Sequence, residues 1–156
     1  MEPDSHSEVL LAQIARLRGE PTVALEIVTR TLESNPENHR ALLERAQIAR
    51  ALGDARQARQ SLAQADALGG RSPEYHALGA ELALESESWS EAVRHLQVLV
   101  ELGQVNANVL TDLGYALANL GRSQEAAARW EEALALDPSH EAAAHNLAAL
   151  REAMDL

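Results

Sequence analysis

Histidines and adjacent acidic residues are the side chains of this sequence best suited to chemistry, yet they form no catalytic pattern. His140 and His145 are close in sequence, but a five-residue step places them about 140° apart around a helix, which suits a shared metal ion poorly. Glu131 and Glu132 are adjacent acids typical of a solvated helix face. The sequence has no His-Glu-x-x-His motif, no glycine-rich phosphate loop and no spacing that argues for a Ser-His-acid triad. We therefore predict that the protein is not an enzyme and has no metal site and no cofactor.

Composition excludes several further classes of protein. The chain has 156 residues, 13 basic residues that are all arginine, 24 acidic residues and a formal net charge of −11. It has no cysteine, so disulfides, cysteine-ligated zinc and thiol catalysis are excluded. The negative charge argues against nucleic acid and anionic membranes as partners. No apolar run approaches the roughly 18 residues of a membrane span, so no membrane insertion is predicted.

The N-terminal segment carries no sign of a secretory signal, because it is acidic and lacks a basic stretch followed by an apolar one. If Met1 is native, we expect a cytoplasmic protein, whereas a periplasmic location stays open if a signal was removed. The arginine-only, alanine-rich composition is common in GC-rich genomes and favours a bacterial source.

A spacing of 34 residues organises almost the whole chain. One set of small residues recurs at this spacing: Ala24, Ala58, Ala92 and Ala126. A second set of small residues recurs in the same register: Ala12, Ala46, Ala80, Gly114 and Ala148. Agreement of side-chain size at several positions predicts repeats at 5–38, 39–72, 73–106 and 107–140, with a half repeat at 141–156 after an N-terminal tail at 1–4.

Each repeat shows the pattern of two helices, most clearly in the last one. Residues 107–120 place leucines on one face at steps of three and four, and Gly121 follows where a helix end favours a positive φ. Residues 125–136 form a second amphipathic segment that Asp137-Pro138 ends. Alternation typical of strands is absent, so the sequence predicts an all-α fold. One helix pair cannot bury its apolar face alone, and successive pairs must therefore stack.

The last repeat resembles the tetratricopeptide repeat (TPR) family through Leu113-Gly114, Leu117, Ala126, Trp130 and Pro138. The resemblance extends over residues 5–156, treated as a single domain. It implies a right-handed superhelical solenoid of four 34-residue helix-turn-helix repeats, with a C-terminal capping helix at 141–156. A plain helical bundle is the alternative. Solenoids whose repeats have about 40 residues or more fit the gapless 34-residue spacing less well.

The resemblance also implies a function, because the first helix of each repeat in this family lines a concave groove. It implies a noncatalytic module that binds a partner peptide or helix there, as a scaffold, assembly factor or chaperone. The groove residues by this resemblance are Gln13, Arg16, Arg40, Glu44, Gln47, Arg50, Leu78, Glu81, Glu85, Asn108, Thr111, Asp112, Tyr115 and Asn119.

Charge is unevenly distributed along the chain. Residues 1–78 hold nine arginines and 11 acids, whereas residues 79–156 hold four arginines and 13 acids. We therefore expect a protein or peptide partner that is mixed in charge, or basic toward the C-terminal repeats. Its acidic part would lie near Arg16, Arg40 and Arg50. The alternative is that these charges only keep a concave surface hydrated.

Other interpretations stay open at this point. The Ala-rich helix at 141–156 has two interpretations: it is an ordinary cap, or it leaves apolar surface through which the chain forms a homo-oligomer as a self-associating structural module. The chain could instead be an accessory domain of a larger enzyme. Some family members bind chaperone tails through a cationic clamp, but the matching positions here include Val9, Gln13, Glu44 and Glu74, so that function is not expected.

Two residues depart from the repeat pattern. Glu87 stands where the other turns have glycine, so either a positive φ costs about 1 kcal/mol or the turn differs. Arg45 stands where a core leucine is expected, and we predict that it pairs with a nearby acid or extends to the edge of the core.

Overall fold

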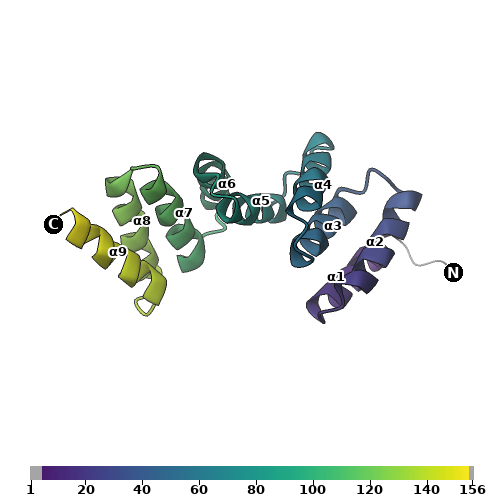
Figure 1. The fold of residues 1–156 in the computed structure, drawn as a ribbon, viewed down its shortest axis with the longest axis horizontal. Coiled ribbons are helices and arrows are strands. Elements are labelled where there is room, and N and C mark those ends of the chain that lie inside the picture. The colour runs from purple at the N-terminus through teal and green to yellow at the C-terminus, as the bar shows by residue number, and fades with distance from the viewer. Residues whose placement is uncertain (1–4, 155–156) are drawn as a thin grey trace. The chain divides into compact units, whose positions relative to one another are not determined.

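The computed structural model describes residues 5–154, which form helices joined by short turns, as Figure 1 shows. The helices are α1 (Ser5–Leu17), α2 (Pro21–Ser34), α3 (His39–Ala51), α4 (Ala55–Ala67), α5 (Pro73–Glu85), α6 (Trp89–Glu101), α7 (Ala107–Asn119), α8 (Ser123–Leu136) and α9 (Glu141–Ala153). The first helix of each pair begins at the first residue of a predicted repeat. The second helix of the last pair begins at Ser123, two residues before the predicted start. None of the helices within these residues is long and apolar enough to cross a bilayer.

Two compact units make up the chain, residues 1–78 and residues 79–156, and α5 contains the boundary. Within the first unit α1 packs on α2 and α3 packs on α4, and within the second α7 packs on α8 and α8 on α9. The predicted tail at residues 1–4 and the last two residues of the predicted capping helix lie outside the described residues.

Small side chains lie where the two helices of a pair approach each other. Ala12 on α1 and Ala24 on α2 are both 0% exposed. In the last pair Gly114 on α7 faces Trp130 on α8, and a Cβ at Gly114 would lie only 2.5 Å from the indole Nε1. The buried indole nitrogen donates a hydrogen bond to the Thr111 carbonyl oxygen over 3.1 Å. The large tryptophan is therefore accommodated by the missing side chain of Gly114.

Arg45 and Gly79 occupy the same position in neighbouring repeats, and in each repeat the size of the facing side chain on the second helix differs accordingly. The Arg45 guanidinium donates hydrogen bonds to the Ser61 hydroxyl over 2.9 Å and to the Gln64 side-chain oxygen. Within residues 5–154 no acid forms an ion pair with Arg45, so of the two alternatives predicted for it the pairing with an acid is wrong. One repeat later Gly79 faces His95, whose ring would lie 2.5 Å from a Cβ at Gly79. A long side chain meets a short one in both pairs.

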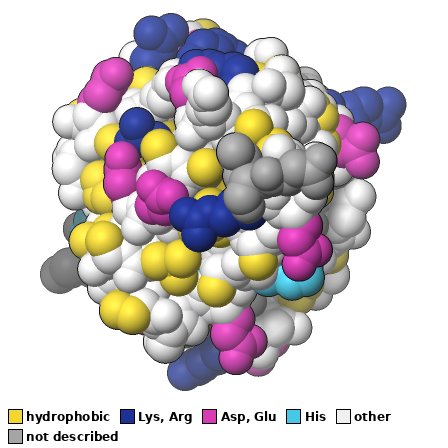
Figure 2. Space-filling view, turned by 90° about the vertical axis from the view of Figure 1, so that its left-hand side faces the viewer, with side chains coloured by type: hydrophobic (Ala, Val, Ile, Leu, Met, Phe, Trp, Pro, Cys, Tyr) yellow, Lys and Arg dark blue, Asp and Glu magenta, His cyan; other side chains and the backbone are white. Residues whose placement is uncertain are grey.

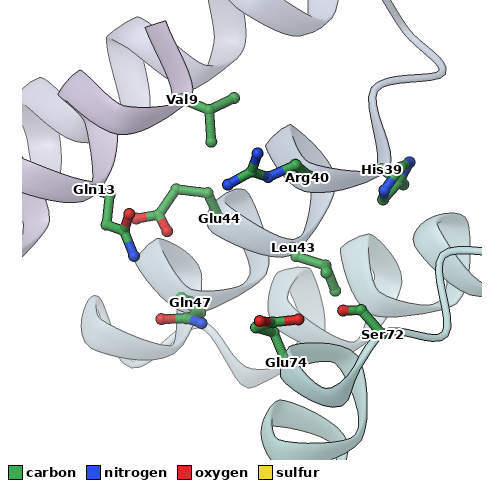
Figure 3. Close-up of a pocket in the computed structure, with 9 residues that line it drawn as sticks. All are labelled: Val9, Gln13, His39, Arg40, Leu43, Glu44, Gln47, Ser72 and Glu74. Atoms are coloured by element: carbon green, nitrogen blue, oxygen red, sulfur yellow. The ribbon is translucent and has the colours of Figure 1, made fainter. Parts of the chain in front are cut away.

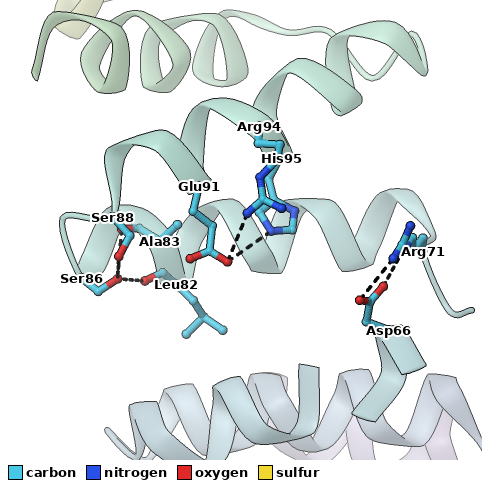
Figure 4. Close-up of polar contacts among 9 residues, drawn as sticks. All are labelled: Asp66, Arg71, Leu82, Ala83, Ser86, Ser88, Glu91, Arg94 and His95. Carbon is cyan, nitrogen blue, oxygen red and sulfur yellow. Dashed lines mark hydrogen bonds and ion pairs between the residues drawn. The ribbon is translucent and has the colours of Figure 1, made fainter. Parts of the chain in front are cut away.

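Side-chain caps begin several helices. Asn38, Asp54 and Asn106 accept hydrogen bonds from backbone amides in the first turns of α3, α4 and α7, and the His140 ring does so at α9. Ser88 and Glu91 have the spacing of a capping box, but the Ser88 side chain makes no capping hydrogen bond at the start of α6. As Figure 4 shows, the Ser88 hydroxyl instead lies 3.1 Å from the hydroxyl of Ser86, which donates to the Leu82 carbonyl oxygen.

The turn inside each of the four helix pairs has the same geometry, including the one that lacks glycine. Gly121 has φ 75° and Glu87 has φ 57°. After the first helix the Arg122 amide donates to the Leu117 carbonyl, and the Ser88 amide donates to the Ala83 carbonyl in the same way. Glu87 therefore adopts the left-handed conformation rather than changing the turn.

Replacing Glu87 by glycine should stabilise the protein. The left-handed conformation costs a side chain about 1 kcal/mol or more, whereas glycine loses part of that gain through its freer unfolded state. We expect the free energy of unfolding in urea to rise by about 0.5 kcal/mol. Gly121→Ala is the matched control, because a Cβ there meets nothing within 4 Å and only the backbone is strained. That change should lower stability, and a loss of stability in Glu87→Gly would contradict the interpretation.

Candidate partner-binding site

A pocket of about 360 Å³ lies in the first unit, as Figure 3 shows. Side chains from α1, from α3 and from the start of α5 surround it. Its lining residues are Val9, Gln13, His39, Arg40, Leu43, Glu44, Gln47, Ser72 and Glu74. Four of the predicted groove residues, Gln13, Arg40, Glu44 and Gln47, therefore come together in one cavity.

Helix α3 contributes most of the pocket through one face. Arg40, Leu43, Glu44 and Gln47 follow steps of three and four residues, which stack side chains on one side of a helix. The Asn38 side chain caps the start of this helix by accepting a hydrogen bond from the Ala41 amide over 3.1 Å, and it thereby fixes where the helix begins.

Arg16 and Glu44 neutralise each other at the edge of this pocket. The Arg16 Nε donates to the Glu44 Oε1 over 2.6 Å, and Glu44 is only 5% exposed. A buried carboxylate needs such a partner, because an unpaired charge away from water is costly. Arg16 is therefore committed to the fold of the first unit.

Arg40 is the arginine that lines the pocket. Its Nη1 lies 2.9 Å from the His6 Nδ1. The pKa of Glu74 is lowered by a hydrogen bond from the Ser72 side chain, then by its own backbone amide, with a smaller contribution from the charge of Arg40. Arg40 is exposed, so its guanidinium can meet a carboxylate from another molecule.

The second unit carries an acidic surface on α5 and α7. Asp112 is exposed, but neighbouring groups partly desolvate its carboxyl, and this raises its pKa; the negative charge of Glu81 raises the pKa further, and His140 has a smaller opposing effect. Tyr115, on the same helix as Asp112, is 47% exposed and meets Trp89 edge to face at 5.5 Å between ring centroids. An acidic group beside an exposed aromatic ring suits a cationic side chain.

The other predicted groove residues have different surroundings. Leu78 and Thr111 are buried, and the Thr111 hydroxyl donates to the Ala107 carbonyl. Asn108 contacts the His140 ring over 2.8 Å, and the Asn119 side chain donates to the Tyr115 carbonyl. Arg50 and Glu85 are exposed. Thr111 and Leu78 are therefore positioned to support the surface rather than to contact a partner.

The sequence did not predict that His39, Leu43 and Ser72 would line a binding groove. The step from Arg40 to Leu43 and on to Gln47 was a readable signal, since it keeps Leu43 on the same face of α3. His39 and Ser72 lie at the start of α3 and just before α5, where the sequence gives no direction for the side chain. Within residues 5–154 no group of three or more histidine, cysteine or acidic side chains is placed to hold a metal ion.

Two family models, both described as tetratricopeptide repeat, match residues 15–82 and 107–140. The chain belongs to the tetratricopeptide repeat family, and it is an interaction module of this kind. Members of the family are generally not catalytic. A comparison with curated protein sequences found no match.

Several solved structures have the same fold. MamA from Desulfovibrio magneticus RS-1 (residues 41 to the end) matches with a TM-score of 0.87 and 17% identity over 99% of this chain and 88% of that one. YrrB, described as a TPR protein with an unusual peptide-binding site, matches with a TM-score of 0.87 and 20% identity over 97% and 78%. PilF from Pseudomonas aeruginosa matches with a TM-score of 0.82 and 18% identity over 97% and 69%. The predicted all-α solenoid class is confirmed.

Replacing Glu81 by glutamine should lower the pKa of Asp112. Removing the negative charge leaves partial desolvation as the cause of the remaining rise, so the pKa should fall toward the ordinary value of about 3.9 without reaching it. The measurement is an NMR titration of the Asp112 carboxyl carbon. Glu85→Gln is the matched control on the same helix and should leave the titration unchanged. An unchanged titration in Glu81→Gln would show that the two carboxylates do not interact.

Proposed function

We propose that this protein is a noncatalytic module that binds a partner protein through an extended peptide or a helix, acting as a scaffold, assembly factor or chaperone. The arginine-bearing pocket of the first unit binds an acidic segment of the partner. The acidic surface of the second unit binds a basic segment. Each unit contributes its own contact, so the partner is mixed in charge.

The observation that carries this proposal is the position of Arg40. It is exposed and lines a cavity whose other side chains include the polar Gln13 and Gln47 and the apolar Val9 and Leu43. Seven of the nine lining side chains are polar or charged, Glu74 among them, so the cavity suits a polar segment of a partner and Arg40 is its cationic group. Arg16 is neutralised by the buried Glu44, so Arg40 is the arginine of this site that a carboxylate can reach.

A random peptide library displayed on phage tests the proposal without knowledge of the natural partner. We expect the protein to enrich peptides that contain acidic residues, and Arg40→Glu to remove this preference because it reverses the charge in the pocket. Peptides synthesised from the enriched sequences should bind the variant at least about tenfold more weakly, and their association rate should fall with salt.

Arg56→Glu is the matched control, because Arg56 is an exposed arginine of the same unit that does not line the pocket. It makes the same change in net charge and should keep the acidic preference. If both variants lost the preference equally, only the overall charge would matter. If neither lost it, the pocket would not be the binding site.

Self-association is the second candidate function, and exposed positions of the repeat pattern favour it. Ile14 on α1 is 46% exposed, whereas its counterpart Ile48 on α3 is 0% exposed beneath the first helix pair. Ala148 on α9 is exposed, whereas its counterpart Ala46 is buried. Figure 2 shows apolar side chains between charged ones on the side of the molecule where α8 and α9 lie. The two end helices, α1 and α9, therefore each carry apolar surface that a further repeat would cover.

Sedimentation velocity over a concentration series tests this candidate. We expect association at high protein concentration that Ile14→Glu weakens, because a buried carboxylate in the contact would be unpaired. Leu102→Glu is the control, since Leu102 is an exposed leucine in a turn rather than on an end helix. A protein that stays monomeric at all concentrations removes the candidate.

A further inference from the structure

A second pocket lies on the first unit, apart from the one around Arg40. It has a volume of about 430 Å³ and is lined by Leu32, Pro36, Leu42, Arg45, Gln64, Ala67 and Leu68. The side chains come from the end of α2, from α3 and from the end of α4. None of them belongs to the first pocket, which α1, α3 and the start of α5 surround.

Helix α3 faces the two pockets with two different sides. Arg40, Leu43 and Gln47 lie on one side, whereas Leu42 and Arg45, three residues apart, lie together on the other. The walls of the second pocket are mostly apolar, with Leu32 and Leu42 buried and Leu68 exposed at the rim. Arg45 and Gln64 are its polar groups.

Arg45 stands out because its charge is matched by neutral groups only. Its guanidinium donates hydrogen bonds to the Ser61 hydroxyl and to the Gln64 side-chain oxygen. Both of these acceptors are electrically neutral. Within the described residues no acid forms an ion pair with Arg45. Partial burial lowers the pKa of its guanidinium, with no opposing contribution from a carboxylate. A half-buried cation without a counter-ion is an incomplete electrostatic arrangement.

We propose that this second pocket binds a small aliphatic carboxylic acid, with its carboxylate on Arg45 and its hydrocarbon chain against Leu32, Leu42 and Leu68. The carboxylate supplies the missing negative charge, and a guanidinium donor fork matches its two oxygens. The pocket volume and its few polar groups among apolar walls are those of a small-molecule site. This inference concerns another face of α3 and does not depend on the partner-binding proposal.

NMR titration of the whole chain with hexanoate tests the proposal. We expect saturable shifts of the Leu32, Leu42 and Leu68 methyl signals and of the Gln64 side-chain amide, with a Kd of about 1 mM for so small a ligand. Hexanamide has the same chain without the charge and should bind at least about tenfold more weakly. N-acetyl-leucine is a third ligand, which represents the C-terminal residue of a protein, and it should not be the only one of the three that binds.

Arg45→Leu should abolish the hexanoate shifts, and circular dichroism should show that it folds, because leucine occupies the matching positions 11 and 113. Arg45→Gln gives a second test that keeps a polar side chain. Arg56→Gln, at an exposed arginine outside the pocket, is the control and should bind normally. The proposal is overturned if hexanoate and hexanamide shift the signals equally, or if Arg45→Leu and Arg45→Gln still bind hexanoate. It is also overturned if N-acetyl-leucine is the only ligand that binds, because the pocket would then recognise the end of a protein chain.

Discussion

Close approach of the two helices in each pair is the constraint on which the rest of the structure depends. It requires short side chains where the helices approach each other, and Ala12 on α1 and Ala24 on α2 are both fully buried. When the second helix carries Trp130, the first helix must present Gly114, because even a single Cβ would overlap the indole. The spacing of helices therefore decides which large side chains the core can hold. With the pairs fixed in this way, the first helices direct charged and polar side chains outward.

The same constraint explains why the repeats tolerate unusual residues. At the position where leucine is expected, one repeat has Arg45 and the next has Gly79. The second helix of the pair places Ser61 opposite Arg45 and His95 opposite Gly79. In each case a long side chain faces a short one, so neither pair overfills the space between the helices. Neither replacement is a defect of packing. Arg45 nevertheless places a cation within an apolar surface, and that placement gives the first unit a feature that its packing alone does not need.

Helix order and turn positions were predictable from the sequence, because both rest on short-range signals that repeat every 34 residues. Gly121 marked a turn through its conformational freedom, and even Glu87 was recognisable as its counterpart, although only the structure shows that the turn is kept. The helix-pair fold followed from the register of small residues. Side-chain pairing was less accessible, because it depends on residues far apart in sequence. Arg16 reaches Glu44 over 28 positions, and Arg45 reaches Ser61 over 16.

Net charge describes the molecule poorly, because it does not show which charged side chains are already paired with one another. Arg16 and Glu44 cancel within the first unit, and Arg71 forms an ion pair with Asp66 close to the start of α5, as Figure 4 shows. In the second unit Glu91 lies 3.7 Å from Arg94 on the same helix turn, an exposed contact that contributes little to stability. Recognition of another molecule therefore depends on the charged side chains that do not take part in such ion pairs. In the first unit these include Arg40 and Arg45, which lie on different faces of one helix and can meet different ligands.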